Sequence, residues 1–206
     1  MSFEEWNQRW EQDRIGFNEG QPNAFLVKHA AKFGKPRRIL VPLAGKAADM
    51  HWLSGKGFDV VGIEFVQKAI DAFFKETAKV ATPHRLGAHD AFYADGVTLV
   101  HADIFDVTPE TIGHFDAVYD RAALVALDPS QRLAYAKRCR ELLTPGGGIL
   151  LIGFSYDQTQ REGPPWSVDQ AAVHETYAGM TIEVLETRGV PESKITGLEE
   201  TVYWIS

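Results

Sequence analysis

A carboxylate follows the second of two apolar segments, at a spacing that favours nucleoside binding. Residues 39–42 and 59–63 are predicted to form neighbouring parallel strands, and Glu64 ends the second strand, nineteen residues after Gly45. In an open parallel sheet, a carboxylate at the tip of the second strand can accept hydrogen bonds from ribose hydroxyls. An acid at a strand tip can also simply face solvent, so the spacing from Gly45 is what predicts a nucleoside site.

The turn after the first strand excludes the two common phosphate-binding loops. A dinucleotide enzyme would carry Gly-x-Gly-x-x-Gly here, because the glycines let the backbone approach a pyrophosphate. This turn contains one glycine, Gly45, and Ala47 stands where a phosphate loop needs Ser or Thr to hold magnesium. A cofactor without phosphate fits better. S-adenosylmethionine is such a cofactor, since it needs a close backbone turn, a carboxylate for its ribose and an apolar slot for its adenine.

Polar residues after the third and fourth predicted strands complete the candidate site. Asp103 is placed for the adenine amino group, with Ile104 against the ring. Asp120 and Arg121 follow the next strand, at the edge where an open sheet presents its reactive groups. Two alternatives stay open, because Asp103 can be an ordinary loop acid and Asp120 can form a structural ion pair with Arg121.

The histidines and the cysteine predict neither a metal centre nor a nucleophilic site. His84, His89, His101 and His114 lack the helical spacing of metal ligands, which favours surface or core roles. Cys139 is the only cysteine, so an intramolecular disulfide and a cysteine metal cluster are both excluded. We therefore expect no metal.

Composition narrows the class of protein further. The chain has 206 residues, 45% of them hydrophobic and 24% charged, which is ordinary for one globular domain. Its net charge of −7 argues against nucleic-acid binding, which needs clustered Lys and Arg. The first residues lack a basic segment followed by an apolar run, and no stretch approaches the roughly 18 apolar residues of a membrane span. We expect a cytoplasmic monomer that binds neither nucleic acid nor membrane.

Periodicity predicts the elements that position these residues. Helical spacing covers residues 2–10, 23–34, 47–54, 67–77 and 128–143, and strand patterns cover residues 39–42, 59–63, 97–101, 115–119, 149–154, 181–188 and 200–205. Residues 87–96 are predicted to be a loose connection. The expected fold is α/β: a doubly wound, mostly parallel seven-stranded sheet of the class I S-adenosylmethionine-dependent methyltransferase type with an antiparallel C-terminal strand. One domain spans 1–206, with an N-terminal helical lid at 1–34 and the sheet domain at 39–206.

Two motifs are more distinctive than a generic glycine turn. They are Val41-Pro-Leu-Ala-Gly-Lys46 and Asp120-Arg-Ala-Ala-Leu-Val125, and shorter segments such as Gly163-Pro-Pro-Trp166 accompany them. With these motifs, the chain resembles the bacterial branch of the thiopurine S-methyltransferase family over nearly its whole length. Two positions depart from the family pattern, since Ala44 replaces a usual Cys and Asn18 a usual His.

The resemblance implies a set of site residues. Cofactor contacts are expected at Trp10, Leu43, Gly45, Glu64, Asp103, Ile104 and Arg121. Arg121 is also the expected catalytic residue, because it could favour a thiolate electrostatically, and Phe17 and Trp166 could sandwich the acceptor ring.

The implied reaction is an in-line displacement of the sulfonium methyl by the sulfur of an aromatic or heterocyclic thiol, or by a selenium or tellurium analogue. The products would be the methylated acceptor and S-adenosylhomocysteine. Such a reaction depends on aligning acceptor and methyl in a desolvated pocket. Two alternatives remain: a methyltransferase for another small acceptor, such as an oxyanion, a halide or an amine, and a non-catalytic nucleoside-binding module.

Overall fold

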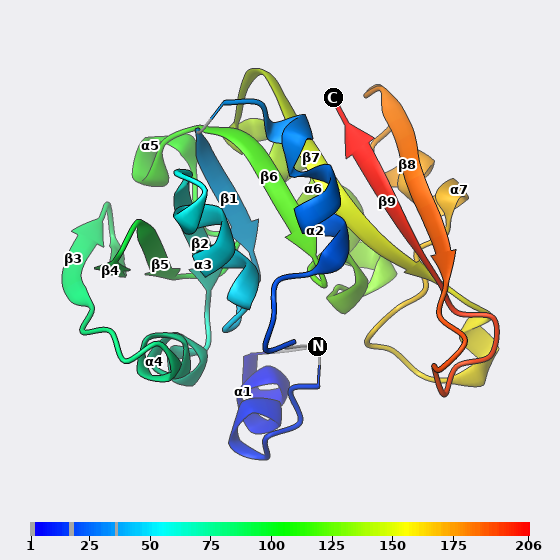
Figure 1. Ribbon diagram of the computed structural model, residues 1–206, viewed down its shortest axis with the longest axis horizontal. Helices are drawn as coiled ribbons and strands as arrows, with labels where there is room; N and C mark the ends of the chain where they lie inside the picture. The colour runs from blue at the N-terminus through cyan, green and yellow to red at the C-terminus, as the bar shows by residue number, and fades with distance from the viewer. Residues whose placement is uncertain (1–2, 17–18, 36) are drawn as a thin grey trace.

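One mixed β-sheet organises the part of the chain that the computed structural model describes, residues 3–16, 19–35 and 37–206. Within these residues the sheet has nine strands in the order β3-β4-β5-β2-β1-β6-β7-β9-β8 (Figure 1). The strands are β1 Arg38–Pro42, β2 Asp59–Glu64, β3 Thr82–Leu86, β4 His89–Ala94, β5 Val97–His101, β6 Phe115–Arg121, β7 Leu143–Ser155, β8 Ile182–Gly189 and β9 Glu199–Ile205.

The central strands β5, β2, β1, β6 and β7 are parallel. Their residues are apolar on both faces, as a sheet covered by helices on both sides requires. Successive residues of β1 show this alternation, because Ile39 packs into the hydrophobic cluster on one face and Leu40 into the cluster on the other. The chain leaves β1 for β2 on one side, and β6 lies on the other side of β1. The strand order therefore reverses beside β1, where a crevice for ligands opens at the carboxyl ends.

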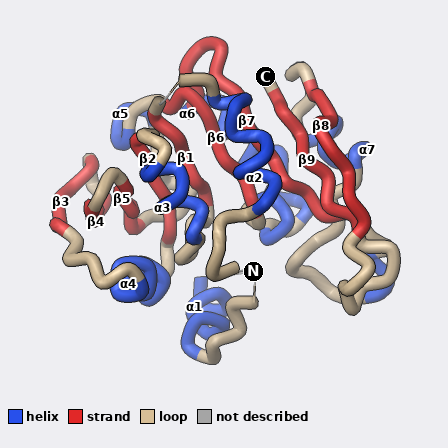
Figure 2. The backbone as a smooth tube through the Cα atoms, in the orientation of Figure 1, coloured by secondary structure: helices blue, strands red, loops and turns tan. Residues whose placement is uncertain are grey.

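Helices cover both faces of the sheet (Figure 2). The helices are α1 Phe3–Glu11, α2 Ala24–His29, η1 Ala30–Phe33, α3 Ala48–Gly55, α4 Gln67–Glu76, α5 Pro109–Ile112, η2 Leu124–Ala126, η3 Pro129–Gln131, α6 Arg132–Leu142, η4 Gln158–Gln160 and α7 Gln170–Thr176. Most buried apolar residues of α2, α3 and α4 belong to one hydrophobic cluster, and those of α5, α6 and α7 to the other. The predicted doubly wound arrangement is therefore present.

The N-terminal segment begins below the sheet and then crosses onto one face. In Figure 1 the arrowheads of β1 and β6 point toward α1, so α1 lies at the carboxyl edge. Asn23 caps α2 as predicted, because its side chain accepts the N–H of Phe25 at 2.9 Å. Phe25 and Leu26 are then buried against the sheet.

The sheet differs from the prediction at its first edge. Residues 87–96 were expected to be a loose connection, but β4 lies within this range, forms an antiparallel hairpin with β3 and pairs with β5. The seven strands expected are thus corrected to nine across the described residues. The polar and exposed segment Thr82–Leu86 gives no apolar alternation, so its strand conformation depends on pairing with β4.

Smaller differences concern the ends of elements. Asp128 caps the 3-10 turn Pro129–Gln131, and the α-helix proper begins only at Arg132. β7 starts at Leu143, so the glycines expected to precede this strand lie within it. The predicted antiparallel C-terminal pair is present as β8 and β9.

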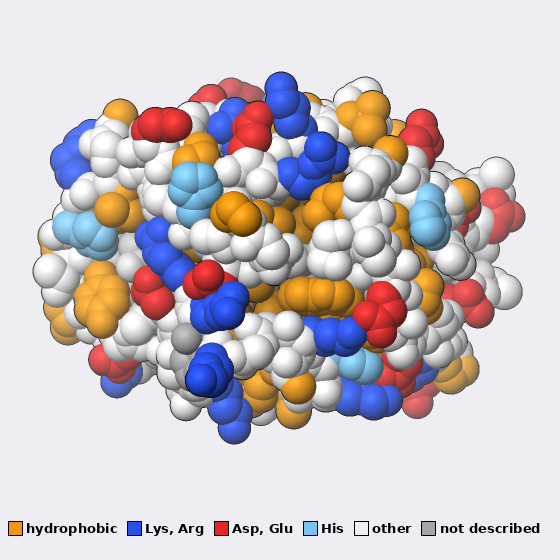
Figure 3. Space-filling view, turned by 90° about the horizontal axis from the view of Figure 1, so that it is seen from above, with side chains coloured by type: hydrophobic (Ala, Val, Ile, Leu, Met, Phe, Trp, Pro, Cys, Tyr) orange, Lys and Arg blue, Asp and Glu red, His pale blue; other side chains and the backbone are white. Residues whose placement is uncertain are grey.

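The surface gives no sign of a polyanion-binding patch on the face seen in Figure 3, where basic and acidic side chains are interspersed. No helix in the described part of the chain is both long and apolar enough to cross a membrane.

Candidate active site

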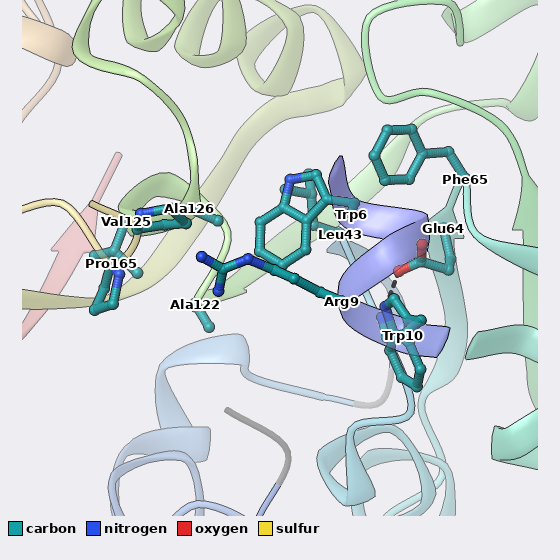
Figure 4. A pocket seen from close by; sticks show the side chains of 12 residues that line it. Trp6, Arg9, Trp10, Leu43, Glu64, Phe65, Ala122, Val125, Ala126 and Pro165 are labelled. Carbon is teal, nitrogen blue, oxygen red and sulfur yellow. Dashed lines mark hydrogen bonds between the residues drawn. The ribbon is translucent and has the colours of Figure 1, made fainter. Parts of the chain in front are cut away.

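A cleft opens at the carboxyl ends of β1, β2 and β6, and it has an empty volume of about 640 Å³ including the part open to solvent. Its lining residues come from α1, the turn after β1, the end of β2, the turn after β6 with η2, and a loop after η4: Trp6, Arg9, Trp10, Leu43, Gly45, Glu64, Phe65, Ala122, Val125, Ala126, Pro164 and Pro165. Figure 4 shows Trp6 and Arg9 between Glu64 and Phe65 on one side and Val125, Ala126 and Pro165 on the other. We call this space the main cleft.

Glu64 is the buried carboxyl group of the main cleft. Its side chain lies at the tip of β2, where Oε2 accepts the N–H of Gly45 at 2.8 Å and Oε1 accepts the N–H of Val66 at 2.7 Å. Burial raises its pKa to about 7, although the backbone N–H groups oppose this shift. Further donors, such as a pair of hydroxyls, would favour the carboxylate form.

Close packing at Gly62 brings the turn after β1 to Glu64. A side chain at Gly62 of β2 would meet Ala44 at 2.8 Å and the sulfur of Met50 at 2.9 Å. Glycine at this position lets the turn after β1 and the start of α3 rest directly on β2. The N–H of Gly45 is thereby held against Glu64, as the nineteen-residue spacing predicts.

Two residues that line the main cleft have left-handed backbone conformations. Leu43 follows β1 with a φ of 48°, and Ala122 follows β6 with a φ of 66°. Non-glycine residues rarely adopt this conformation, and they often do so at functional sites. The sequence gives no signal for either, because Leu and Ala have no preference for such angles.

A second cavity of about 410 Å³ adjoins the main cleft and shares Trp6, Leu43 and Phe65 with it. It is also lined by Asp103 and Ile104, and its walls are largely apolar. Its remaining lining residues are Ile63, Ala102, Phe105, Leu127 and Gln131. The structure therefore brings Asp103 and Ile104 beside Leu43 and Glu64, in the arrangement that the sequence predicts.

Helix α1 closes one side of the main cleft. Trp10 is 3% exposed and packs on Val66 and Ala69 at the start of α4. Trp6 and Arg9 extend into the cleft, with the Arg9 guanidinium 5.5 Å from the Trp6 ring. Sequence reasoning placed Trp10 here and missed Trp6 and Arg9 as site residues, although the spacing of Trp6 and Trp10 already put them on one face of a helix.

Arg121 lies beside the main cleft, at the end of β6. Its side chain is only 9% exposed and forms an ion pair with Glu19. Neighbouring Asp120 has other partners, because it accepts the Tyr135 hydroxyl at 2.7 Å and the N–H of Leu124 at 3.1 Å. The alternative of an ion pair between Asp120 and Arg121 is therefore wrong, and Asp120 instead fixes the turn after Arg121.

Of the two residues predicted to sandwich the acceptor ring, Phe17 and Trp166, the structure describes only Trp166. Phe17, with Asn18, lies outside the described residues. The backbone N–H of Trp166 donates to the carbonyl of Val125 at 2.6 Å, and the indole ring packs over Gly163. The neighbouring Pro164 and Pro165 line the main cleft, and Trp166 is not among its lining residues.

Metal binding and cysteine-based nucleophilic catalysis find no support among residues 3–16, 19–35 and 37–206. Within these ranges, no group of three or more His, Cys, Asp or Glu could hold a metal ion. Cys139 is fully buried, and burial raises the pKa of its thiol, which makes it a poor nucleophile.

Comparisons with known proteins agree with this geometry. The profile of the family described as Thiopurine S-methyltransferase (TPMT) matches residues 1–206. A thiopurine S-methyltransferase of Pseudomonas fluorescens is 37% identical, covering 100% of this chain and 99% of the relative. One of Xanthobacter autotrophicus is 42% identical, covering 90% and 89%.

Among solved structures, the chain is similar to a 1,6-didemethyltoxoflavin-N1-methyltransferase of Burkholderia thailandensis with bound 1,6-didemethyltoxoflavin and S-adenosylhomocysteine. The TM-score is 0.71 at 18% identity, covering 98% of this chain and 85% of the other. At this identity the likeness concerns the fold, and it confirms the predicted methyltransferase-type architecture.

Proposed function

The chain belongs to the thiopurine S-methyltransferase family, and from this membership we propose that the main cleft transfers the methyl group of S-adenosylmethionine to the sulfur of an aromatic or heterocyclic thiol. The products are the methyl thioether and S-adenosylhomocysteine. The observation that carries the proposal is the buried carboxyl group of Glu64, held at the tip of β2 against the turn of Gly45 and facing a cleft whose other lining residues, except Arg9, are uncharged.

The residues present fit S-adenosylmethionine. Glu64 is buried with backbone N–H groups as its donors, and the two hydroxyls of a ribose would add the donors that stabilise its charged form. The second cavity offers Ile104 as an apolar wall and Asp103 as a polar edge, which suits an adenine. When bound, the cofactor supplies a methyl group activated by a sulfonium.

The acceptor side of the main cleft favours a flat apolar ring. Val125, Ala126, Pro164 and Pro165 form a wall without charged groups, so a bound acceptor exchanges water for apolar contacts. Rate enhancement then comes mainly from holding the acceptor in line within a site that excludes water. We assign Arg121 to the negative charge of the acceptor, because it is the last residue of β6 and precedes Ala122, which lines the main cleft.

We also propose that α1 is the lid of this site. Its described packing on α4 is through Trp10, and its Trp6 and Arg9 extend into the space between the cofactor-binding and acceptor-binding walls. Cofactor and acceptor would enter this space when α1 is open, and α1 would then close over them. Movement of α1 relative to the sheet domain would therefore accompany binding.

One experiment separates this function from its alternatives. The protein is incubated with S-adenosylmethionine and, in turn, an aromatic thiol, a selenol, tellurite, a halide and an amine, and S-adenosylhomocysteine is measured. Release with thiols, at rates well above those with the oxyanion, halide and amine, is the expected result. Release of S-adenosylhomocysteine with another acceptor alone would show that this acceptor, and not a thiol, is the substrate. Tight cofactor binding without any release of S-adenosylhomocysteine would identify a binding module. Sedimentation of the same protein tests the expected monomer.

A further inference from the structure

Arg121 is a largely buried cation that faces carboxylates of different character. Its side chain is 9% exposed, and its ion-pair partner Glu19 is 50% exposed. A second acid, Asp49, interacts electrostatically with both groups. Burial raises the pKa of Asp49, and the charge of Glu19 raises it further. The N–H of Asn23 and the charge of Arg121 lower it. In the described part of the chain, Arg121 is thus surrounded by two acids that could balance its charge.

Asp49 is the acid that is fixed in place. It is 3% exposed, and its Oδ1 accepts the N–H of Asn23 at 2.6 Å while its Oδ2 accepts the Tyr119 hydroxyl at 3.2 Å. Both of its oxygens are therefore held by donors that belong to the cap of α2 and to β6. Moving Asp49 would leave a buried charge without these hydrogen bonds, which is costly.

Glu19 is the replaceable partner. One of its oxygens contacts Arg121, and the other is 3.5 Å from the side-chain amide of Asn23, which is at the limit of a hydrogen bond. Glu19 also lines a third cavity of about 660 Å³, together with Lys46 and Glu76. The carboxylate of Glu19 can leave Arg121 for this cavity and solvent without burying its charge.

We propose that Glu19 determines acceptor specificity by occupying the position on Arg121 that an anionic acceptor takes. The inference rests on the proposed function. When a thiolate or a ring carboxylate binds, it replaces the carboxylate of Glu19, while Asp49 stays in place. An anion thus contacts the buried guanidinium in both states, which favours an anionic acceptor over a cationic one.

The test compares two acceptors of the same size, 3-mercaptobenzoate and 3-mercaptobenzamide, in the wild-type protein and in Glu19→Gln. Removing the competing carboxylate should lower the KM for 3-mercaptobenzoate about two- to fivefold, the range set by a half-exposed ion pair. Affinity for S-adenosylhomocysteine should stay the same. An equal fall for the benzamide assigns Arg121 to the sulfur of the acceptor, and a smaller fall assigns it to the ring carboxylate.

Controls separate this effect from charge and folding. Glu183 lies on the edge strand β8, beyond β9, and its exposed carboxylate pairs with Lys32. Glu183→Gln therefore changes the net charge by the same amount as Glu19→Gln. Glu19→Ala provides a second variant without the carboxylate, and it must lower the same KM.

An unchanged or raised KM for 3-mercaptobenzoate in the Glu19 variants overturns the inference, as does an equal fall in Glu183→Gln. A parallel change in cofactor affinity also overturns it, because Glu19 would then act through the cofactor. If the wild-type protein methylates neither thiol, the proposed function itself has failed. If it methylates them with a KM that is the same in the wild-type protein and in the Glu19 variants, only this inference has failed.

Discussion

Leu43 and Ala122 directly follow the neighbouring strands β1 and β6, both in the left-handed conformation, and both line the main cleft. The backbone thus turns sharply on each side of the place where cofactor and acceptor are proposed to meet. Ala122→Val should lower the free energy of unfolding by about 1–2 kcal/mol, because β-branched residues tolerate positive φ poorly. Ala122→Gly should stay within about 0.5 kcal/mol of wild type, since relief of strain is offset by greater freedom of the unfolded chain. Urea unfolding measures both, and a Val variant as stable as wild type would contradict the strain.

Glu64 should dominate cofactor affinity. Glu64→Gln keeps the size of the side chain and removes its charge, so ribose hydroxyls lose a charge-assisted hydrogen bond. We expect S-adenosylhomocysteine to bind roughly ten- to hundredfold more weakly, corresponding to about 1.5–3 kcal/mol. Calorimetry measures the affinity, with Glu183→Gln as the control for net charge. Equal affinities for wild type and Glu64→Gln would remove Glu64 from the ribose site.

Cofactor affinity should also depend on pH. The pKa of Glu64 is raised by burial to about 7, so the ligand-free site carries a proton for much of the time below neutrality. Because ribose hydroxyls favour the carboxylate, affinity for S-adenosylhomocysteine should rise up to about tenfold between pH 6 and pH 8 and then level off. Glu64→Gln should abolish this rise, and a flat profile for the wild-type protein would contradict the assignment.

The same titration has the opposite effect on stability. A carboxyl whose folded pKa exceeds its unfolded value binds protons more tightly in the folded state, so the free energy of unfolding falls as pH rises through that interval. Glu64, raised from 4.5 to about 7, and Asp120, raised from 3.8 to about 6, both act in this direction. We expect the ligand-free protein to lose stability from about pH 5 to pH 7, and Glu64→Gln to lose less. Urea titrations across this range test the sign.

Arg121→Ala should reduce turnover through the acceptor. We expect kcat/KM for an aromatic thiol to fall about ten- to hundredfold, as for the loss of a charged hydrogen-bond donor. Arg121→Lys should restore only part of the rate, because lysine keeps the charge without the planar fork. A loss confined to cofactor affinity would assign Arg121 to the cofactor alone. Unchanged kinetics in a folded Arg121→Ala protein would exclude any role in the reaction.

The proposed lid should become ordered when the cofactor binds. Amide hydrogen exchange in Phe3–Glu11 should slow on adding S-adenosylhomocysteine, since closure over the ligand protects the helix. Exchange in β7 should not change, because this strand is buried between β6 and β9 in either state. Equal protection of α1 with and without ligand would rule out the lid.

The parallel core and the position of Glu64 could be predicted because they depend on local signals. Apolar runs with short turns define β1 and β2, and parallel pairing then brings Gly45 to Glu64. The β3–β4 hairpin gives no such signal, since its residues are polar and its conformation depends on its partner strand. The contact between Glu19 and Arg121 joins positions 102 residues apart, and only packing of the whole chain determines it.

The two edges of the sheet are also barriers to self-association. An edge strand presents unpaired backbone groups that can recruit another chain, and proteins block this with proline, charges or irregular pairing. β3 carries Pro83 and Arg85, whereas β8 carries Glu183 and Glu186 and loses its regular register with β9 beside Glu186. Lys28 of α2 and Lys32 of η1 hold these two acids in ion pairs. A nine-stranded sheet can thus remain open at both ends without offering a flat apolar edge for fibre growth.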